Sequence, residues 1–147
     1  MSPNFEQLRK LVLRCGSVFY GHIPGVVSEK RHYIFLLNEN AREDADYALV
    51  VASSKVEKVD YMRKIFGYDT IAEIPPGTEP FLDKPTFVNC NDVKLINIRF
   101  IKGKFDCGDL KCLNETLSKP TLINIINCVK NSRTISEEIK SFLPKSI

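Results

Sequence analysis

The fold is decided by residues 31–54, which read RHYIFLLNENAREDADYALVVASS. This stretch holds two apolar runs, Arg31–Leu37 and Tyr47–Ala52, with the polar and acidic residues 38–46 between them. Short apolar runs bounded by polar turn-forming residues are typical of largely buried β-strands. We therefore predict two buried strands at the centre of the fold, joined by a surface loop.

Shorter strands are predicted on both sides of this pair. The sequence indicates them at residues 17–20, 70–74, 86–90 and 93–101. The last of these carries polar residues among its apolar ones, so one of its faces is predicted to meet water. About five or six short strands with close turns are typical of a small barrel or sandwich, and a barrel removes exposed sheet edges.

Helices are predicted outside the strands. Ser2 and Pro3 suit the start of a first helix, and Gly16 and Gly67 are predicted helix stops. Apolar residues at helical spacing predict a further helix that begins at Ser118. Capping boxes, in which a hydroxyl side chain and a glutamate satisfy each other's backbone N–H, are predicted at two helix starts. These two capping boxes are Ser54 with Glu57, and Thr134 with Glu137.

Composition and charge place the chain among globular proteins of one-domain size. It has 147 residues, of which 44% are hydrophobic and 27% are charged. Its apolar runs are far shorter than the roughly 20 residues of a membrane span, and its N-terminal pattern is charged, so neither an anchor nor a signal peptide is expected. Five cysteines, an odd number, favour reduced thiols and a cytoplasmic location. The net charge of +3 permits an anionic partner without requiring one.

Polar residues that could carry chemistry flank the two central strands. Arg31 and His32 precede the first strand, where an arginine can hold a phosphate through two parallel N–H bonds and a histidine can transfer protons near neutral pH. Ser53 and Ser54 follow the second strand, where a hydroxyl can face a ligand. A solvated strand end would also explain Arg31 and His32, and a helix cap would also explain Ser54.

Two other places could carry chemistry. His22 lies in the loop after the first short strand, where it could contact a substrate or transfer a proton, although a loop histidine is usually part of the surface. Asn89–Asp92 is interpreted as a turn, because Cys90 would need an adjacent base to act as a nucleophile. The two histidines and the spacing of the cysteines do not predict a zinc site.

Several segments, read in order, resemble the PemK/MazF family of bacterial toxins. Three of them are Gly16–Tyr20, Arg31–Leu37 and Leu49–Ser54. Thr86–Cys90 is similar to a later strand of that family, and Val93–Ile98 could follow it. The resemblance implies a small SH3-like barrel over roughly residues 16–101, usually as a homodimer. We expect a single domain in which an N-terminal helix precedes this barrel and a helical extension, at about residues 110–145, follows it.

The resemblance also implies an activity. Such toxins cleave single-stranded RNA without a metal or other cofactor, and they pair with an antitoxin protein. The family's catalytic arginine falls on Arg31, and its threonine or serine falls on Ser53 or Ser54. The arginine would stabilise charge on the phosphate or act as an acid, and the serine would hydrogen-bond the same group. The chain departs from the family at His32, where the usual residue is proline, and in a loop with less glycine before Arg31.

Other functions stay open at this point. A nuclease would need further substrate contacts, for which His22, Lys94 and Arg99 are candidates. The same barrel could instead be a non-catalytic module that binds RNA or a protein, with Arg31, Lys94, Arg99 and Lys102 as a surface for phosphates. The tail helices could also pack their apolar face on a partner protein, or they could cover the chain's own barrel.

Overall fold

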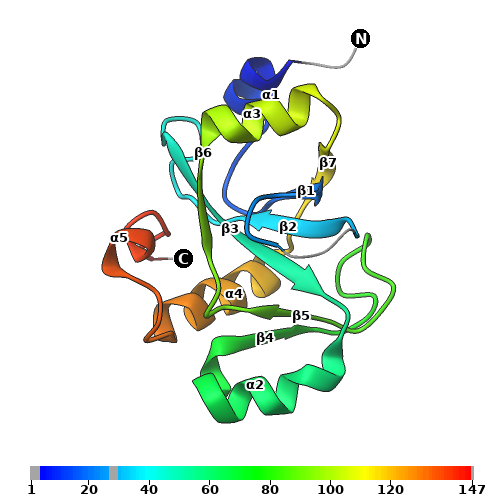
Figure 1. Cartoon of the computed structure of the whole chain (residues 1–147), viewed down its shortest axis with the longest axis vertical. Helices are drawn as coiled ribbons and strands as arrows, with labels where there is room; N and C mark the ends of the chain where they lie inside the picture. The colour runs from blue at the N-terminus through cyan, green and yellow to red at the C-terminus, as the bar shows by residue number, and fades with distance from the viewer. Residues whose placement is uncertain (1–3, 27–29, 147) are drawn as a thin grey trace.

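The computed structural model describes residues 4–26 and 30–146 (Figure 1). These residues form seven strands and five α-helices, and two single turns of 3₁₀-helix, η1 and η2, flank α2. In chain order the elements are α1 (Phe5–Leu11), β1 (Ser17–Gly21), β2 (His32–Leu36), β3 (Asp46–Ser53), η1 (Val56–Lys58), α2 (Val59–Phe66), η2 (Tyr68–Thr70), β4 (Ile71–Ile74), β5 (Thr86–Asn89), β6 (Lys94–Asn97), α3 (Ile98–Asp106), β7 (Leu110–Thr116), α4 (Lys119–Asn131) and α5 (Glu137–Lys140).

The seven strands form one antiparallel sheet in the order β4-β5-β3-β2-β1-β7, and β6 also pairs with β3. The long strand β3 is its centre, because β2 pairs along one edge while β6 and β5 share the other. This arrangement confirms the predicted α+β class and the two central strands. No pairing among the described residues joins the outer strands β4 and β7, so the closure of a barrel remains a prediction.

Different helices cover the two faces of the sheet (Figure 1). Alternate residues of a strand point to opposite faces, so Val50 and Leu49 of β3 enter different cores. The core that contains Val50 is completed by α4 and α5, and the core that contains Leu49 is completed by α1 and α3. Helix α2 packs through Val59 on Phe87, which pairs with Ser53 and so lies on the Leu49 face. We call this second face the α1–α3 face.

The tail helix α4 is part of the chain's own core. Its residues Ile125, Ile126 and Val129 have no exposed surface and pack against the sheet. The apolar face predicted for the tail therefore covers this chain's own sheet.

The prediction of a single strand over residues 93–101 is wrong. Strand β6 ends at Asn97, and α3 begins at Ile98. The Asn97 side chain caps this helix, since its Oδ1 accepts the Arg99 N–H at 2.9 Å. Burial of Ile101 against α1 then holds the helical turn in place. Of the polar residues interpreted as one face of this strand, Lys94 and Asn97 lie in β6, whereas Arg99 and Lys102 lie on the exposed side of α3.

The predicted helix ends also need correction. Helix α1 stops at Leu11, well before Gly16, and its capping box is formed by Asn4 and Gln7. Ser2 and Pro3 lie outside the described residues. The stop at Gly67 is confirmed, since this residue is the C-cap of α2.

Neither predicted capping box forms. Before η1 the hydroxyl that accepts a backbone N–H is that of Ser53, whose Oγ lies 3.2 Å from the Lys55 nitrogen, and not that of Ser54. Helix α5 is capped by Ser136, which accepts the Ile139 N–H at 3.2 Å. Thr134 does not cap this helix, because its hydroxyl donates to the Asn91 carbonyl at 3.1 Å instead. Tertiary hydrogen bonds thus override a local sequence pattern.

Residues 110–116 form β7, although we predicted a helical extension from about residue 110. Strand β7 pairs with β1, with Leu110 opposite Gly21 and Cys112 opposite Phe19. The sheet therefore extends beyond residues 16–101. The side chains of β7 are mostly half-exposed, so its apolar pattern is too weak to indicate a strand without the partner.

The approach of β7 to β1 depends on Gly21. This residue has a φ of +151°, and a Cβ built on it would lie 2.0 Å from the Asp109 carbonyl oxygen. We expect Gly21→Ala to lower the free energy of unfolding by about 2 kcal/mol, because the backbone of β7 has to move. Chemical denaturation measures this change. Gly103→Ala is the control, since nothing lies within 4 Å of its Cβ and alanine favours the helix α3; equal losses in both variants would contradict the prediction.

Candidate functional site

The start of β2 and the end of β3 lie side by side. These strands are antiparallel, with Ile34 opposite Val51, so extending the register by two residues brings His32 opposite Ser53. A direct contact agrees with this, since His32 Nδ1 lies 3.3 Å from the Ala52 carbonyl oxygen. Arg31 directly precedes β2 and Ser54 directly follows β3, so they lie at the same end of the sheet.

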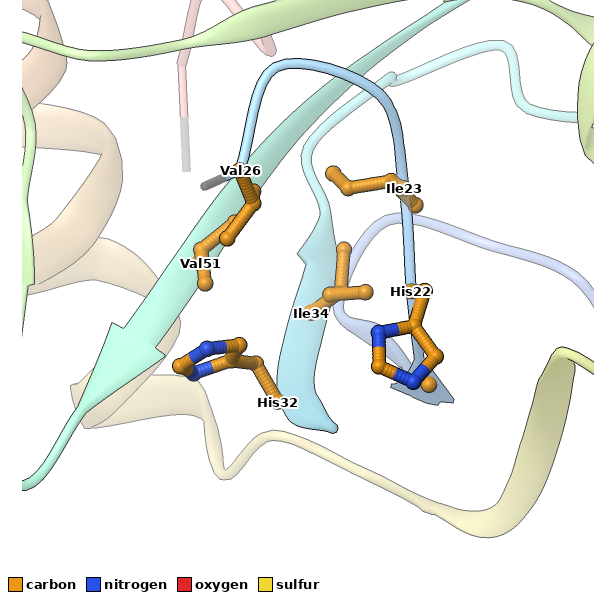
Figure 2. Close-up of a pocket in the computed structure, with 7 residues that line it drawn as sticks. His22, Ile23, Val26, His32, Ile34 and Val51 are labelled. Carbon is orange, nitrogen blue, oxygen red and sulfur yellow. The ribbon is translucent and has the colours of Figure 1, made fainter. Parts of the chain in front are cut away.

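A small hollow opens beside these strand ends on the α1–α3 face (Figure 2). The first residues of the loop between β1 and β2 fold over the sheet and form one wall. The hollow encloses about 190 Å³ including its open mouth. The enclosed inner part of the hollow has room for about one water molecule. The lining residues are Gly21, His22, Ile23, Val26, His32, Ile34 and Val51.

One ring nitrogen of His32 makes a hydrogen bond, and the other has no hydrogen-bond partner among the described residues. A carbonyl oxygen can only accept, so Nδ1 carries the proton in the contact with Ala52. Nε2 is buried and has no hydrogen-bond partner among the described residues. In the neutral ring this nitrogen carries a lone pair. His32 is therefore oriented as a proton acceptor at the edge of the hollow.

His22, which directly follows β1, lines the same hollow. Its backbone N–H donates to the Asp109 carbonyl at 3.1 Å, which attaches the start of the loop to the residue before β7. Its side chain is half-buried. In Figure 2 the two imidazole rings lie on either side of Ile34. The loop histidine is thus part of the site and not only of the surface.

The remaining polar groups at this end are more exposed. Ser53 is half-buried, and its Oγ already accepts the Lys55 N–H, which leaves its hydroxyl proton free to donate. Ser54 and Arg31 are exposed. Within residues 4–26 and 30–146, no hydrogen bond or ion pair holds the Arg31 guanidinium. These groups are therefore available to an anion that approaches the strand ends.

The two other basic residues chosen from the sequence lie in different places. Lys94 is opposite Leu49 of β3, pairs with the Asp92 carboxylate at 2.8 Å, and would meet a Cβ on Gly25 at 3.2 Å. It therefore lies under the β1–β2 loop. Arg99 is exposed in the first turn of α3, beside the Asp46 end of β3. The structure brings Lys94 near the hollow and leaves Arg99 at the opposite end of β3 from Ser53.

The cysteines do not offer a nucleophile at this site. Cys90 is buried, and a hydrogen bond with Cys128, together with burial, raises the pKa of its thiol. The predicted turn after it is confirmed, since the Asp92 N–H donates to the Asn89 carbonyl at 3.1 Å. No group of three or more His, Cys, Asp or Glu residues in the described part of the chain could hold a metal ion.

The thiols should differ sharply in reactivity. Burial raises the pKa of both Cys15 and Cys112 to about 11, while Cys107 is exposed. The reactive form is the thiolate, so at about pH 8 an alkylating reagent is expected to modify Cys107 first. The rates at Cys15 and Cys112 should rise about tenfold per pH unit, because their thiolate fractions grow until pH reaches the pKa. Peptide mass spectrometry over time measures this, and equal rates for the three thiols at pH 8 would contradict it.

Sequence reasoning missed the apolar part of the site. Ile34 and Val51 were interpreted only as core residues, although their side chains form the floor of the hollow. Gly21 was given no role, yet its missing side chain lies directly opposite His32. The only signal in the sequence was the Gly21-His22 step at the end of a strand, and such a step is common in turns.

The fold and the site define a small α+β protein that presents a guanidinium, imidazoles and hydroxyls at one end of an antiparallel sheet. No helix in the described residues is long and apolar enough to cross a membrane.

Comparison with known proteins adds evidence from structural similarity. No protein-family model and no curated protein matches the sequence. Among solved structures, the fold is similar to a chain described as "Endoribonuclease in complex with its cognate antitoxin from Mycobacterial species". The similarity has a TM-score of 0.51 and covers 80% of this chain and 91% of that chain, at 13% sequence identity. At this identity the match shows a shared fold, and the activity has to be argued from this chain's own residues.

Proposed function

We propose that this chain is an endoribonuclease of the PemK/MazF toxin type, which cleaves single-stranded RNA without a metal and is held inactive by an antitoxin. The observation that carries the proposal is that Arg31, His32 and Ser53 lie at adjacent ends of β2 and β3, and that His32 lines a hollow there. The structural similarity to an endoribonuclease that was solved with its antitoxin supports it. An SH3-like barrel, a homodimer and a cytoplasmic location belong to the same proposal.

Each residue has a role that follows from its chemistry. The Arg31 guanidinium can donate two parallel N–H bonds to the scissile phosphate and so stabilise the negative charge that grows in the transition state. The hydroxyl of Ser53 or Ser54 adds a neutral donor to the same oxygens. His32 takes a proton through its unpartnered Nε2. No step requires a metal ion.

The remaining basic residues would bind the RNA strand around the reacting phosphate. His22 lines the hollow, and Lys94 lies under the adjacent loop, so both are within the site region. Arg99 would contact phosphates farther along the strand. Contacts of this kind depend on salt, because each cation that meets a phosphate releases a counterion.

A direct assay tests the proposal. The purified chain is incubated with a long single-stranded RNA and with the same RNA annealed to its complement, both in excess chelator, and the RNA ends are mapped. Sequence-selective cuts in the single strand alone support the proposal. An inert protein, or cleavage that stops when the chelator is present, contradicts it. Growth arrest of a bacterial host on induction should accompany the activity.

A non-catalytic module that binds RNA or a protein is the second candidate. Two observations favour it: Lys94 is already paired with Asp92, and the inner hollow has room for about one water only. Such a module would bind single-stranded RNA without cutting it, and its affinity would fall as salt rises. Binding that is independent of salt would instead indicate a protein partner.

A further inference from the structure

The chain has two histidines, and both line the same hollow. They are separated by the whole β1–β2 loop, so their meeting is a result of the fold (Figure 2). Among unperturbed side chains, histidine alone changes its charge between about pH 5 and 8. A reaction in which one group accepts a proton and another donates a proton needs two such groups at one site.

Separate contacts position the His32 ring and the His22 backbone. His32 is oriented by the bond between its Nδ1 and the Ala52 carbonyl at 3.3 Å, and its Nε2 is left without a partner. His22 is positioned by its backbone bond to Asp109. Gly21, which also lines the hollow, lies opposite His32 in the pairing of β1 with β2.

The surroundings do not neutralise the pair. Ile23, Val26, Ile34 and Val51 form the rest of the lining apart from Gly21, so the hollow has no acidic side chain. The charged groups on the elements packed around it are Arg31, which directly precedes His32, together with Lys94, which is paired with Asp92, and Asp109, which is paired with Lys104 at 3.5 Å. Among the described residues that line the hollow, an anion would therefore meet the two imidazoles and no carboxylate.

We propose that His32 and His22 are the general base and the general acid of one transphosphorylation, an inference that rests on the proposed ribonuclease function. His32 Nε2 takes the proton of a ribose 2′-hydroxyl, and O2′ forms a bond to the adjacent phosphorus. The bond between phosphorus and the 5′ oxygen of the next nucleotide breaks. The His22 imidazolium gives its proton to that oxygen. The products are a 2′,3′-cyclic phosphate and a 5′-hydroxyl, so no water, metal or oxidant is consumed.

This assignment predicts a bell-shaped dependence of cleavage rate on pH. The rate falls at low pH, where a general base is protonated, and at high pH, where a general acid has lost its proton. His32→Gln should remove the acidic limb and His22→Gln the alkaline limb. Each variant is expected to cleave about 100-fold more slowly than the wild type. Tyr33→Phe is the matched control, because Tyr33 is next to His32 but packs with Tyr20 and Phe81 in the other core.

A sulfur-substituted RNA separates the two roles. When sulfur replaces the 5′ oxygen at the scissile bond, the leaving thiolate needs no proton, because a thiol is far more acidic than an alcohol. His22→Gln should then recover most of the wild-type rate, while His32→Gln should stay slow. A purely structural role for His22 would leave that variant slow on both substrates.

The outcomes distinguish this inference from the function on which it rests. If the wild-type chain cuts no RNA, both the proposed ribonuclease function and the assignment of the two histidines are wrong. If the wild-type chain cuts RNA but yields a 3′-phosphate directly, the assignment of the two histidines is wrong and the ribonuclease function stands. The same conclusion follows if the two histidine variants keep both limbs of the pH profile. Thermal unfolding of each variant is measured in parallel, and a variant that unfolds at the assay temperature is replaced by His→Asn at the same position.

Discussion

Replacing Arg31 by alanine is expected to lower the rate of RNA cleavage by about 100- to 1,000-fold, the effect of removing one charge-stabilising donor from a transition state. Folding should be unaffected. Arg31 is exposed, lies outside β2, and has no hydrogen bond or ion pair within the described residues. We therefore expect the free energy of unfolding to change by less than about 0.5 kcal/mol. Single-turnover cleavage and urea denaturation of the same preparation measure the two quantities.

Two further variants give this prediction its controls. Arg31→Lys keeps the charge but not the two parallel N–H bonds, so it should restore only part of the rate. Arg133→Ala removes an exposed arginine that follows α4, on the far face of the sheet, and it should leave cleavage unchanged. An Arg31→Ala protein that cuts RNA within threefold of the wild type would show that the guanidinium does not contact the reacting phosphate.

Asn38→Ala is expected to lower the free energy of unfolding by about 3 kcal/mol, the largest loss of stability that we predict for a single side chain. Asn38 has no exposed surface. Its Nδ2 donates to the Asp46 carbonyl at 2.8 Å and to Asp44 Oδ2 at 2.9 Å, and its Oδ1 accepts the Ala48 N–H at 2.7 Å. Alanine would leave the buried Ala48 N–H and the part-buried acceptors of Asp44 and Asp46 without these partners in the loop that joins β2 to β3.

The neighbouring asparagine provides the control. Asn40 is exposed in the same loop, so Asn40→Ala should change the free energy of unfolding by less than about 0.5 kcal/mol. Guanidinium denaturation followed by circular dichroism compares the two variants with the wild type. If both variants lose the same stability, the three bonds of Asn38 do not hold the loop and the prediction is wrong. Asn38→Asp is informative in addition, because it loses the two donors and keeps an acceptor for Ala48.

The central pair of strands could be predicted because its signal is local. Residues 31–37 and 47–52 are apolar almost throughout, since a strand at the centre of a sheet is covered on both faces. The polar residues at their ends mark where burial stops. Antiparallel pairing of two such runs then brings Arg31 and His32 near Ser53 and Ser54 without further information.

The parts that could not be predicted depend on distant partners. Strand β7 has few buried residues, and it is a strand because β1 supplies its hydrogen bonds across about 90 residues of chain. Helix α3 was mistaken for a strand because Ile98, Ile101 and Phe105 fit more than one pattern until α1 supplies a surface for them. Ser136 caps α5 in place of Thr134, because the Thr134 hydroxyl donates to the distant Asn91 carbonyl.

The sequence by itself determined the apolar strands, the polar residues that end them, and which of these residues could bind or transfer charge. Only the tertiary structure decided that His22 and His32 line the same hollow. It also decided that Lys94 lies under the β1–β2 loop and that Arg99 lies at the far end of β3. The reason is physical. Burial of an apolar run follows from its own residues, whereas the distance between two side chains depends on how the backbone between them is folded.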